Sequence, residues 1–234
     1  RVAPCCSEDG LEVAKDDVKD ANCVAPITTR DLDAVMETLA SSVKPWESGE
    51  FGFVRTIQKA PRNQGRVDEM QVSREGQKPR RVAVKVMKNS WVTSGPVKFK
   101  QVNPEEIEVP WHDFALVKEL NNRGYPYAAD FLGIYSDFED TYVVTSLAPE
   151  GDLFAWACKL PLPGKEREAL VKPVSEQVCS AVRWLHELGI AHRDVSLENF
   201  VVSQDKEHGP QVKLIDFGMS VMGRTCKGGS GAGK

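Results

Sequence analysis

The sequence predicts an α+β fold in two lobes, with a cleft where the lobes meet. Strand-like patterns predominate in the first half: residues 81–87 alternate as a half-buried strand does. The second half contains a longer helical pattern, because residues 173–188 place apolar side chains on one stripe and end at Gly189. This order predicts a small antiparallel-sheet lobe followed by a partial helical lobe.

The chain begins with a segment that resembles a loose extension followed by one helix. Residues 1–26 show no hydrophobic period, whereas Thr28 is a typical helix cap. The apolar residues after it recur at i, i+3, i+4 and i+7, namely Leu32, Val35, Met36 and Leu39. We expect a helix that packs against the domain that follows it.

Residues 46–54 predict a strand, a turn and a second strand around Gly49 and Gly52. Residues 59–81 are strongly polar and rich in Lys and Arg. They are interpreted as a solvated hairpin insertion, and a partner-binding arm is the alternative.

Two helices are predicted between residues 103 and 120. Asn103 and Pro104 form a helix start, and Pro110 ends that piece. The second helix places Asp113 on the same arc as three apolar residues, Leu116, Val117 and Leu120, so Asp113 is expected to point inward. Strands at 131–135 and 141–147, and a hairpin of 200–202 with 212–215, complete the elements.

The composition limits the classes of function. The 234 residues are 41% hydrophobic and 27% charged, as in a globular protein, and the net charge of −4 argues against nucleic-acid binding. No apolar run approaches the roughly 20 residues needed to span a bilayer. Six cysteines show no zinc-like spacing, and Cys158 and Cys179 are expected to be buried free thiols. Reduced thiols favour an intracellular, cytoplasmic setting.

The most informative segment is His192-Arg193-Asp194, with Asn199 at the end of the same loop and Asp216-Phe217-Gly218 beyond the second hairpin. A carboxylate near an attacking hydroxyl, with an amide and a second carboxylate on magnesium, provides the groups that phosphoryl transfer needs. The spacing H-R-D-x-x-x-x-N followed by D-F-G is the protein-kinase signature pair.

These motifs resemble those of the eukaryotic protein kinases, over residues 43–227. The resemblance implies a two-lobed kinase fold and Mg²⁺-dependent transfer of the ATP γ-phosphate to Ser/Thr hydroxyls of protein substrates. Residues 195–198 do not resemble the tyrosine-kinase loop, which favours Ser/Thr. The implied organisation is an N-terminal extension with a bracing helix (1–42), a small lobe (43–147) and a partial large lobe that ends in the activation segment (148–234).

The resemblance also assigns residues of the small lobe. Residues 47–54 would be the glycine-rich loop, with Gly49 and Gly52 approaching the phosphates. Lys85 would contact the α- and β-phosphates, and an inward lysine needs an anionic partner. Asp113 would take the place of the family's helix glutamate, and because it is one methylene shorter, the ion pair would be longer or the helix would shift.

Further roles are implied around the nucleotide and the reacting groups. Thr145 would be the gatekeeper beside the hinge Ser146-Leu147-Ala148, and Asp152 would bind the ribose or cap a helix. The base would lie between apolar side chains, Val54, Ala83 and Val201. Asp194 would be the catalytic carboxylate, and Asn199 and Asp216 would hold Mg²⁺. His192, Phe217 and Val117 would pack in the core between the lobes.

Three departures from the family pattern support an alternative, a non-catalytic pseudokinase that binds nucleotide or a protein partner. These are Glu47 in place of a glycine, Asp113, and Ser196 in place of the lysine that follows the catalytic aspartate. A small-molecule phosphotransferase is a third class, but Arg193 and Phe217-Gly218 favour the protein-kinase branch.

The C-terminal residues carry two further expectations. Arg193 suggests control by an activating kinase that phosphorylates Thr225, with Ser220 or Ser230 as weaker candidates. The tail 228–234 matches the P-loop pattern G-x-x-x-x-G-K but follows no predicted strand. The family's A-P-E motif is absent, so we expect a kinase fragment that is poorly stable or inactive in isolation.

Overall fold

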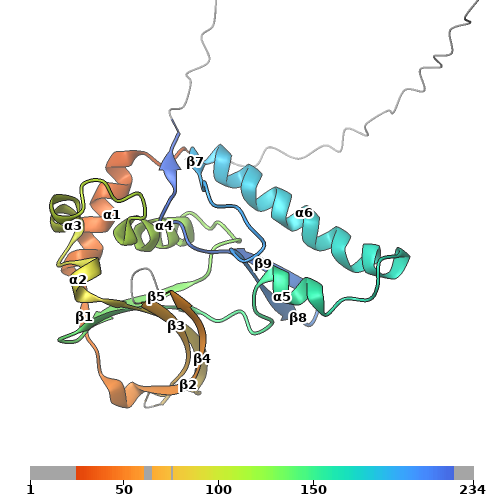
Figure 1. Cartoon of the computed structure of the whole chain (residues 1–234), viewed down its shortest axis with the longest axis horizontal. Helices are drawn as coiled ribbons and strands as arrows, with labels where there is room; N and C mark the ends of the chain where they lie inside the picture. Colours follow the sequence, from red (N-terminus) through yellow and green to blue (C-terminus); the bar gives the residue numbers. More distant parts are fainter. Residues whose placement is uncertain (1–24, 61–64, 75, 224–234) are drawn as a thin grey trace, which may run out of the picture.

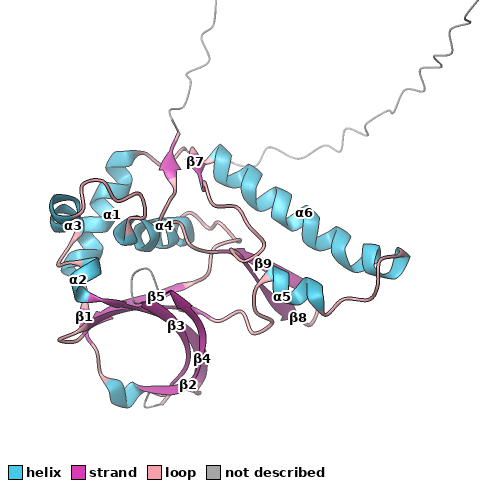
Figure 2. Ribbon diagram, viewed as in Figure 1, coloured by secondary structure: helices cyan, strands magenta, loops and turns pink. Residues whose placement is uncertain are grey.

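A computed structural model describes residues 25–60, 65–74 and 76–223. Figure 2 shows that most strands gather in one lobe and that the longest helix belongs to the other. The helices are α1 Thr29–Ser41, the 3-10 turn η1 Ser48–Glu50, α2 Asn89–Val92, α3 Pro96–Val102, α4 Pro110–Asn122, α5 Leu153–Cys158 and α6 Lys165–Glu187. The α+β, two-lobed prediction is confirmed.

One six-stranded sheet in the order β1-β5-β6-β4-β3-β2 forms the small lobe, and it is strongly curled (Figure 1). Two short two-stranded sheets, β8-β9 and β10-β7, lie in the second lobe. The strands are β1 Lys44–Pro45, β2 Phe51–Ala60, β3 Gly65–Val72, β4 Arg80–Lys88, β5 Phe131–Ser136, β6 Asp140–Ser146, β7 Ile190–Ala191, β8 Phe200–Asp205, β9 Gly209–Leu214 and β10 Val221–Met222.

The central strand β4 has a different environment on each face. Val82, Val84 and Val86 are buried in a core on one face of the sheet. In that core the Trp46 ring stacks between Phe51 and Tyr142, with ring centroids 4.0 Å and 3.9 Å apart. The alternate residues of β4 therefore point to the opposite face, toward the second lobe.

A second, larger core joins the two lobes. It contains buried residues from α1, α4, α6 and the β8-β9 hairpin. Phe217 has no exposed surface and His192 is 2% exposed. Their rings meet edge to face with centroids 5.0 Å apart, as the sequence predicted for the core between the lobes. In the described parts of the chain, no helix is long and apolar enough to cross a membrane.

The predicted hairpin insertion at 59–81 is wrong. Residues 65–72 form β3, which pairs with β2 and β4 inside the sheet. The charged residues of β3 can be buried because neighbouring side chains neutralise them: Asp68 is 1% exposed and accepts a hydrogen bond from Arg66 at 2.7 Å. Likewise, the single strand β2 replaces the strand pair predicted within 46–54.

Three other expectations also need correction. No helix begins at Asn103; instead, α3 ends at Val102 and Pro110 starts α4, where its missing N–H costs nothing. Helix α6 begins at Lys165 and includes Pro173. Cys158 and Cys179 are exposed, because α5 and α6 bury other faces.

Candidate active site between the lobes

A cavity between the lobes collects most of the residues that the sequence singled out. Ala83 and Lys85 of β4 line it, on the face opposite the valine core. From the second lobe, Asp152, Asn199, Val201 and Asp216 line the same cavity. The end of β6 adds Thr145 and Ser146, and the segment that follows it and connects the lobes adds Leu147 and Ala148. Side chains distant in sequence thus surround one space.

Lys85 forms the charged centre of the cavity. Its Nζ lies 2.8 Å from Asp113 Oδ2 and 3.3 Å from Asp216 Oδ1. Asp113 is in the first turn of α4 and only 6% exposed, so its charge needs this partner. The ion pair has an ordinary length although aspartate is one methylene shorter than glutamate.

The second oxygen of Asp113 has a separate role. Phe217 N–H donates to Asp113 Oδ1 at 2.9 Å. Asp113 therefore links β4 to the 216–218 segment through its two oxygens. Asp216 itself has a positive φ of 63°, a conformation that non-glycine residues adopt at a cost and that clusters at functional sites.

The electrostatics of the cavity keep Lys85 charged. Burial by itself would lower the pKa of Lys85, because it disfavours the ammonium form. The charges of Asp113 and Asp216, with the hydrogen bond to Asp113, outweigh burial and raise the pKa of Lys85 above its ordinary value. A fixed positive charge at this position suits an anionic ligand.

The loop at 192–199 orients Asp194 and Asn199 toward each other. Asn199 Nδ2 donates to Asp194 Oδ2 at 2.9 Å and to the Asp194 carbonyl at 2.8 Å. The His192 ring holds the loop: its Nδ1 accepts from Asp194 N–H at 3.3 Å, so Nε2 carries the proton and donates to the Ile215 carbonyl at 3.0 Å. The carboxylate, amide and 216–218 segment are thereby tied together.

Comparison with known proteins agrees with this geometry. The family model described as the protein kinase domain matches residues 64–228. The chain belongs to the protein kinase family.

Its curated relatives include CDPK-related kinase 1 of Arabidopsis thaliana, 32% identical over 61% of this chain and 22% of the relative. Calcium-dependent protein kinase 29 of the same plant is 30% identical over 53% of this chain and 22% of the relative. Serine/threonine-protein kinase RAD53 of Saccharomyces cerevisiae is 29% identical over 43% of this chain and 12% of the relative. This kinase domain therefore spans about a quarter or less of the lengths of these relatives.

The residues predicted to form the glycine-rich loop, 47–54, lie outside the cavity lining. Gly49 lies in η1, Gly52 is the second residue of β2, and Val54 lies further along β2. The cavity lining includes none of the three. Glu47 likewise lies outside the lining, so it no longer counts against nucleotide binding. A Gly-turn-Gly pattern is common in any sheet, and here it marks the entry to β2.

The cavity is instead lined by the C-terminal part of β2 and the N-terminal part of β3. Ile57 and Gln58 of β2 and Val67 of β3 line it. Gly65 begins β3, two residues before Val67. The glycine followed by valine two residues later, shortly before the strand of Lys85, is the signal that could have located this hairpin. Its charged surroundings concealed it.

The donor set fits a magnesium ion bound mainly through a ligand. Among the residues described by the structure, no group of three or more His, Cys, Asp or Glu side chains could hold a metal. Asn199 and Asp216 both line the cavity, and Mg²⁺ typically uses one or two protein oxygens with phosphates and water. Because the Asn199 side-chain N–H donates to Asp194, the Asn199 side-chain oxygen is the atom left to bind a cation.

Of the three residues predicted as phosphorylation sites, the structure describes only Ser220. Ser220 is 4% exposed and its hydroxyl donates to the His192 carbonyl, so it is a poor target for modification. Thr225, Ser230 and the P-loop-like tail lie outside the described residues.

Proposed function

We propose that this kinase domain transfers the γ-phosphate of ATP to serine or threonine hydroxyls of protein substrates. The observation that carries the proposal is one cavity in which Lys85 bridges Asp113 and Asp216 and which Asn199 also lines. Asp194 lies outside that lining but accepts a hydrogen bond from the Asn199 side chain. Catalysis of phosphoryl transfer consists mostly of such positioning and charge compensation. The names of the relatives, including the serine/threonine kinase, support the Ser/Thr assignment.

The proposal gives each group one task. Lys85 binds the α- and β-phosphates, and Asn199 and Asp216 hold Mg²⁺, which would neutralise phosphate charge when bound. Asp194 accepts the hydrogen bond of the substrate hydroxyl and orients it toward the phosphate. Ala83 and Val201 contact the base from opposite lobes, Thr145 and Leu147 border it, and Asp152 meets the ribose.

Asp152 illustrates that two roles can coexist. Its side chain accepts a hydrogen bond from Ala155 N–H at 2.7 Å and so caps α5, while it also lines the cavity. We further propose the lobe division at residues 43–147 and 148–234 and an intracellular setting. Regulation through Thr225 by an activating kinase stays a prediction.

The test is phosphate transfer by the full chain and by Asp194→Asn. The variant keeps a hydrogen-bonding side chain but loses the carboxylate, so its rate should fall by about 100-fold to 10,000-fold. The matched control is Asp205→Asn in the exposed β8-β9 turn, where the rate should be unchanged. Nucleotide binding by Asp194→Asn should persist.

The alternative function, a pseudokinase, depends on Ser196 in place of the loop lysine and on the presence of a single glycine, Gly65, between the lining residues Gln58 and Val67 of the β2-β3 hairpin. It predicts that the chain binds ATP with Mg²⁺ but transfers no phosphate, and that Asp194→Asn changes nothing. Equal transfer by the wild type and Asp194→Asn would contradict the enzymatic proposal.

A further inference from the structure

Helix α1 is a stable, well-capped element outside the cavity. Thr28 and Asp31 form a reciprocal capping box, in which Asp31 N–H donates to Thr28 Oγ1 at 3.2 Å and Thr28 N–H donates to Asp31 Oδ2 at 2.9 Å. Its apolar stripe is buried: Leu32 is 1%, Met36 6% and Leu39 5% exposed. The helix is therefore fixed in place rather than loosely attached.

The stripe of α1 packs against α4, the helix that carries Asp113. Figure 1 shows α1 beside α4 and α3. Every residue of α4 from Pro110 to Asn121 is buried or half-buried. Because Asp113, Phe114 and Val117 line the cavity, α4 lies between the cavity and the covering helix, and α1 limits its outward movement.

Polar contacts tie the same region to both lobes. Arg123, which follows α4, donates to the Ala25 carbonyl and lies 3.9 Å from Asp31 Oδ2. Ile27 N–H donates to the Leu188 carbonyl at 2.9 Å. Leu188 follows α6 and precedes the strand that leads to the 192–199 loop. The segment 25–31 therefore spans from α4 to the second lobe.

The position of α4 in turn determines contacts at the 216–218 segment. Val109 N–H, just before α4, donates to the Gly218 carbonyl at 2.9 Å. Asp113 Oδ1 accepts from Phe217 N–H at 2.9 Å while Asp113 Oδ2 holds Lys85 at 2.8 Å. A short aspartate has little reach, so a small outward shift of α4 would break these contacts.

We propose that α1 is an intramolecular brace that holds α4 inward, and that Leu32, Met36 and Leu39 are positioning residues for the Lys85–Asp113 pair. The effect on catalysis rests on the proposed function, whereas the effect on geometry does not. Loss of packing at α1 lowers the population in which Asp113 bonds both Lys85 and the Phe217 amide.

The first test measures hydrogen exchange of the full chain. Met36→Ala and Leu39→Ala should speed exchange of the Phe217 amide by about tenfold or more, because buried packing is lost only from the inward position of α4. Exchange of the Val202 and Val212 amides, in the β8-β9 hairpin, should stay unchanged. The matched control is Glu37→Ala, an exposed position of the same helix.

The second test uses the length of the side chain at position 113. In the wild type, Asp113→Glu should lower kcat, because one more methylene crowds a pair that already has ordinary length. In the Met36→Ala background, Asp113→Glu should raise kcat above that of Met36→Ala alone, because the longer carboxylate reaches Lys85 from a helix that has moved outward. General destabilisation predicts no such reversal of sign.

The outcomes separate the two proposals. Unchanged exchange at Phe217 in Met36→Ala and Leu39→Ala, or an equal increase throughout the β8-β9 hairpin, overturns the brace. The same effect of Asp113→Glu in both backgrounds also overturns it. Absence of phosphate transfer by the wild type contradicts the proposed function alone, since hydrogen exchange still decides whether α1 positions α4.

Discussion

At the scale of single residues, the cavity is organised by one buried carboxylate that has two partners. Asp113 neutralises Lys85 and accepts the Phe217 amide through different oxygens. A buried charge without such partners would be costly. Asp113 stands where the family pattern has glutamate, a difference that favoured a pseudokinase from sequence. The Lys85–Asp113 ion pair nevertheless forms.

The first residue-scale prediction concerns Lys85→Met. Removal of the fixed cation that we propose binds the phosphates should lower phosphate transfer by at least about 100-fold. Lys88→Met is the matched control, because Lys88 lies on the same strand and pairs with Asp140 and Glu139 away from the cavity. A comparable loss in both variants would show that lysine removal damages the sheet rather than the site. Steady-state assays of both variants decide this.

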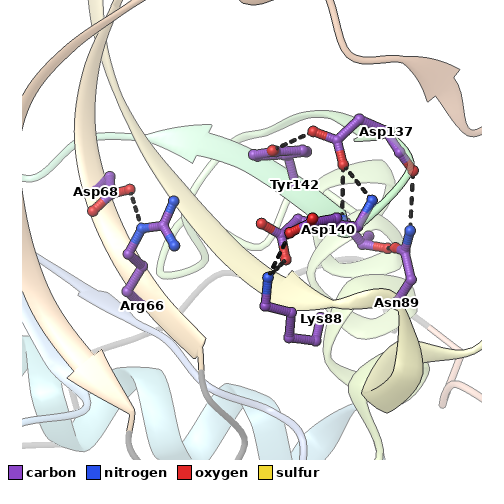
Figure 3. A network of polar contacts seen from close by, with 9 residues as sticks. Arg66, Asp68, Lys88, Asn89, Asp137, Asp140 and Tyr142 are labelled. Atoms are coloured by element: carbon purple, nitrogen blue, oxygen red, sulfur yellow. Dashed lines mark hydrogen bonds and ion pairs between the residues drawn. The ribbon is translucent and has the colours of Figure 1, made fainter.

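Asp137 organises the turn between β5 and β6 (Figure 3). It accepts from the Tyr142 hydroxyl at 2.6 Å and from the backbone of Glu139 and Asp140 at 2.9 Å and 2.8 Å. Its carbonyl accepts a hydrogen bond from the Asn89 side chain, at the start of α2. Burial alone would raise the pKa of Asp137, but these hydrogen bonds outweigh it and lower the pKa.

A lowered carboxyl pKa predicts loss of stability in acid. Asp137 contributes stability above its unfolded pKa of about 3.9, and this contribution disappears as the pH falls through the lower folded value. The free energy of unfolding of Asp137→Asn should therefore fall less between pH 6 and pH 2 than that of the wild type. Denaturant titrations at several pH values test this, and an equal fall in the two proteins would contradict it.

At the scale of elements, β3 shows how a charged strand can occupy the inside of a sheet. Glu69 is 8% exposed and binds Arg55 from β2 and Arg81 from β4. Cross-strand pairs of opposite charge stabilise such a register. The same strand places Val67 over the cavity, so the polar appearance of 59–81 concealed part of the site.

This reassignment gives a prediction for two valines. Val67→Ala removes apolar wall from the cavity that we propose binds ATP, and it should weaken ATP binding about fivefold, which corresponds to roughly 1 kcal/mol. Val54→Ala, 38% exposed on β2 and outside the cavity lining, should leave the affinity unchanged. Calorimetric titration with ATP measures the affinity of both variants and so shows which end of the β2-β3 hairpin contacts the nucleotide. The reverse order of effects would restore the original assignment of residues 47–54.

At the scale of the whole molecule, the cavity exists only because two lobes face each other. Ala83 comes from the sheet lobe, Val201 and Asn199 from the second lobe, and the core around His192 and Phe217 fixes their separation. A ligand that bridges both walls binds the folded state alone. It should therefore stabilise both lobes together.

Magnesium should contribute to this stabilisation. ATP with Mg²⁺ at about 100 times its Kd should raise the free energy of unfolding by about 2.7 kcal/mol, and chelation of Mg²⁺ should reduce that gain. In Asn199→Ala the difference in stabilisation between ATP with and without Mg²⁺ should shrink, because the variant lacks one of the two proposed Mg²⁺ ligands. Gln204→Ala, at an exposed position of the β8-β9 hairpin, should keep the full difference between ATP with and without Mg²⁺. Thermal unfolding with each ligand set is the measurement.

The sequence alone determined the features that depend on local order. The HRD-to-Asn spacing and the DFG motif predicted the groups around the cavity and the family, and the periodicities of 81–87 and of α1 predicted a strand and a buried helix stripe. The tertiary structure decided which glycines approach the cavity, that a charged segment is an inner strand, and that Asp113 serves two partners. Local patterns report which face of an element is apolar, but charge compensation across neighbouring strands, and the distance between α4 and β4, arise only when distant segments pack together.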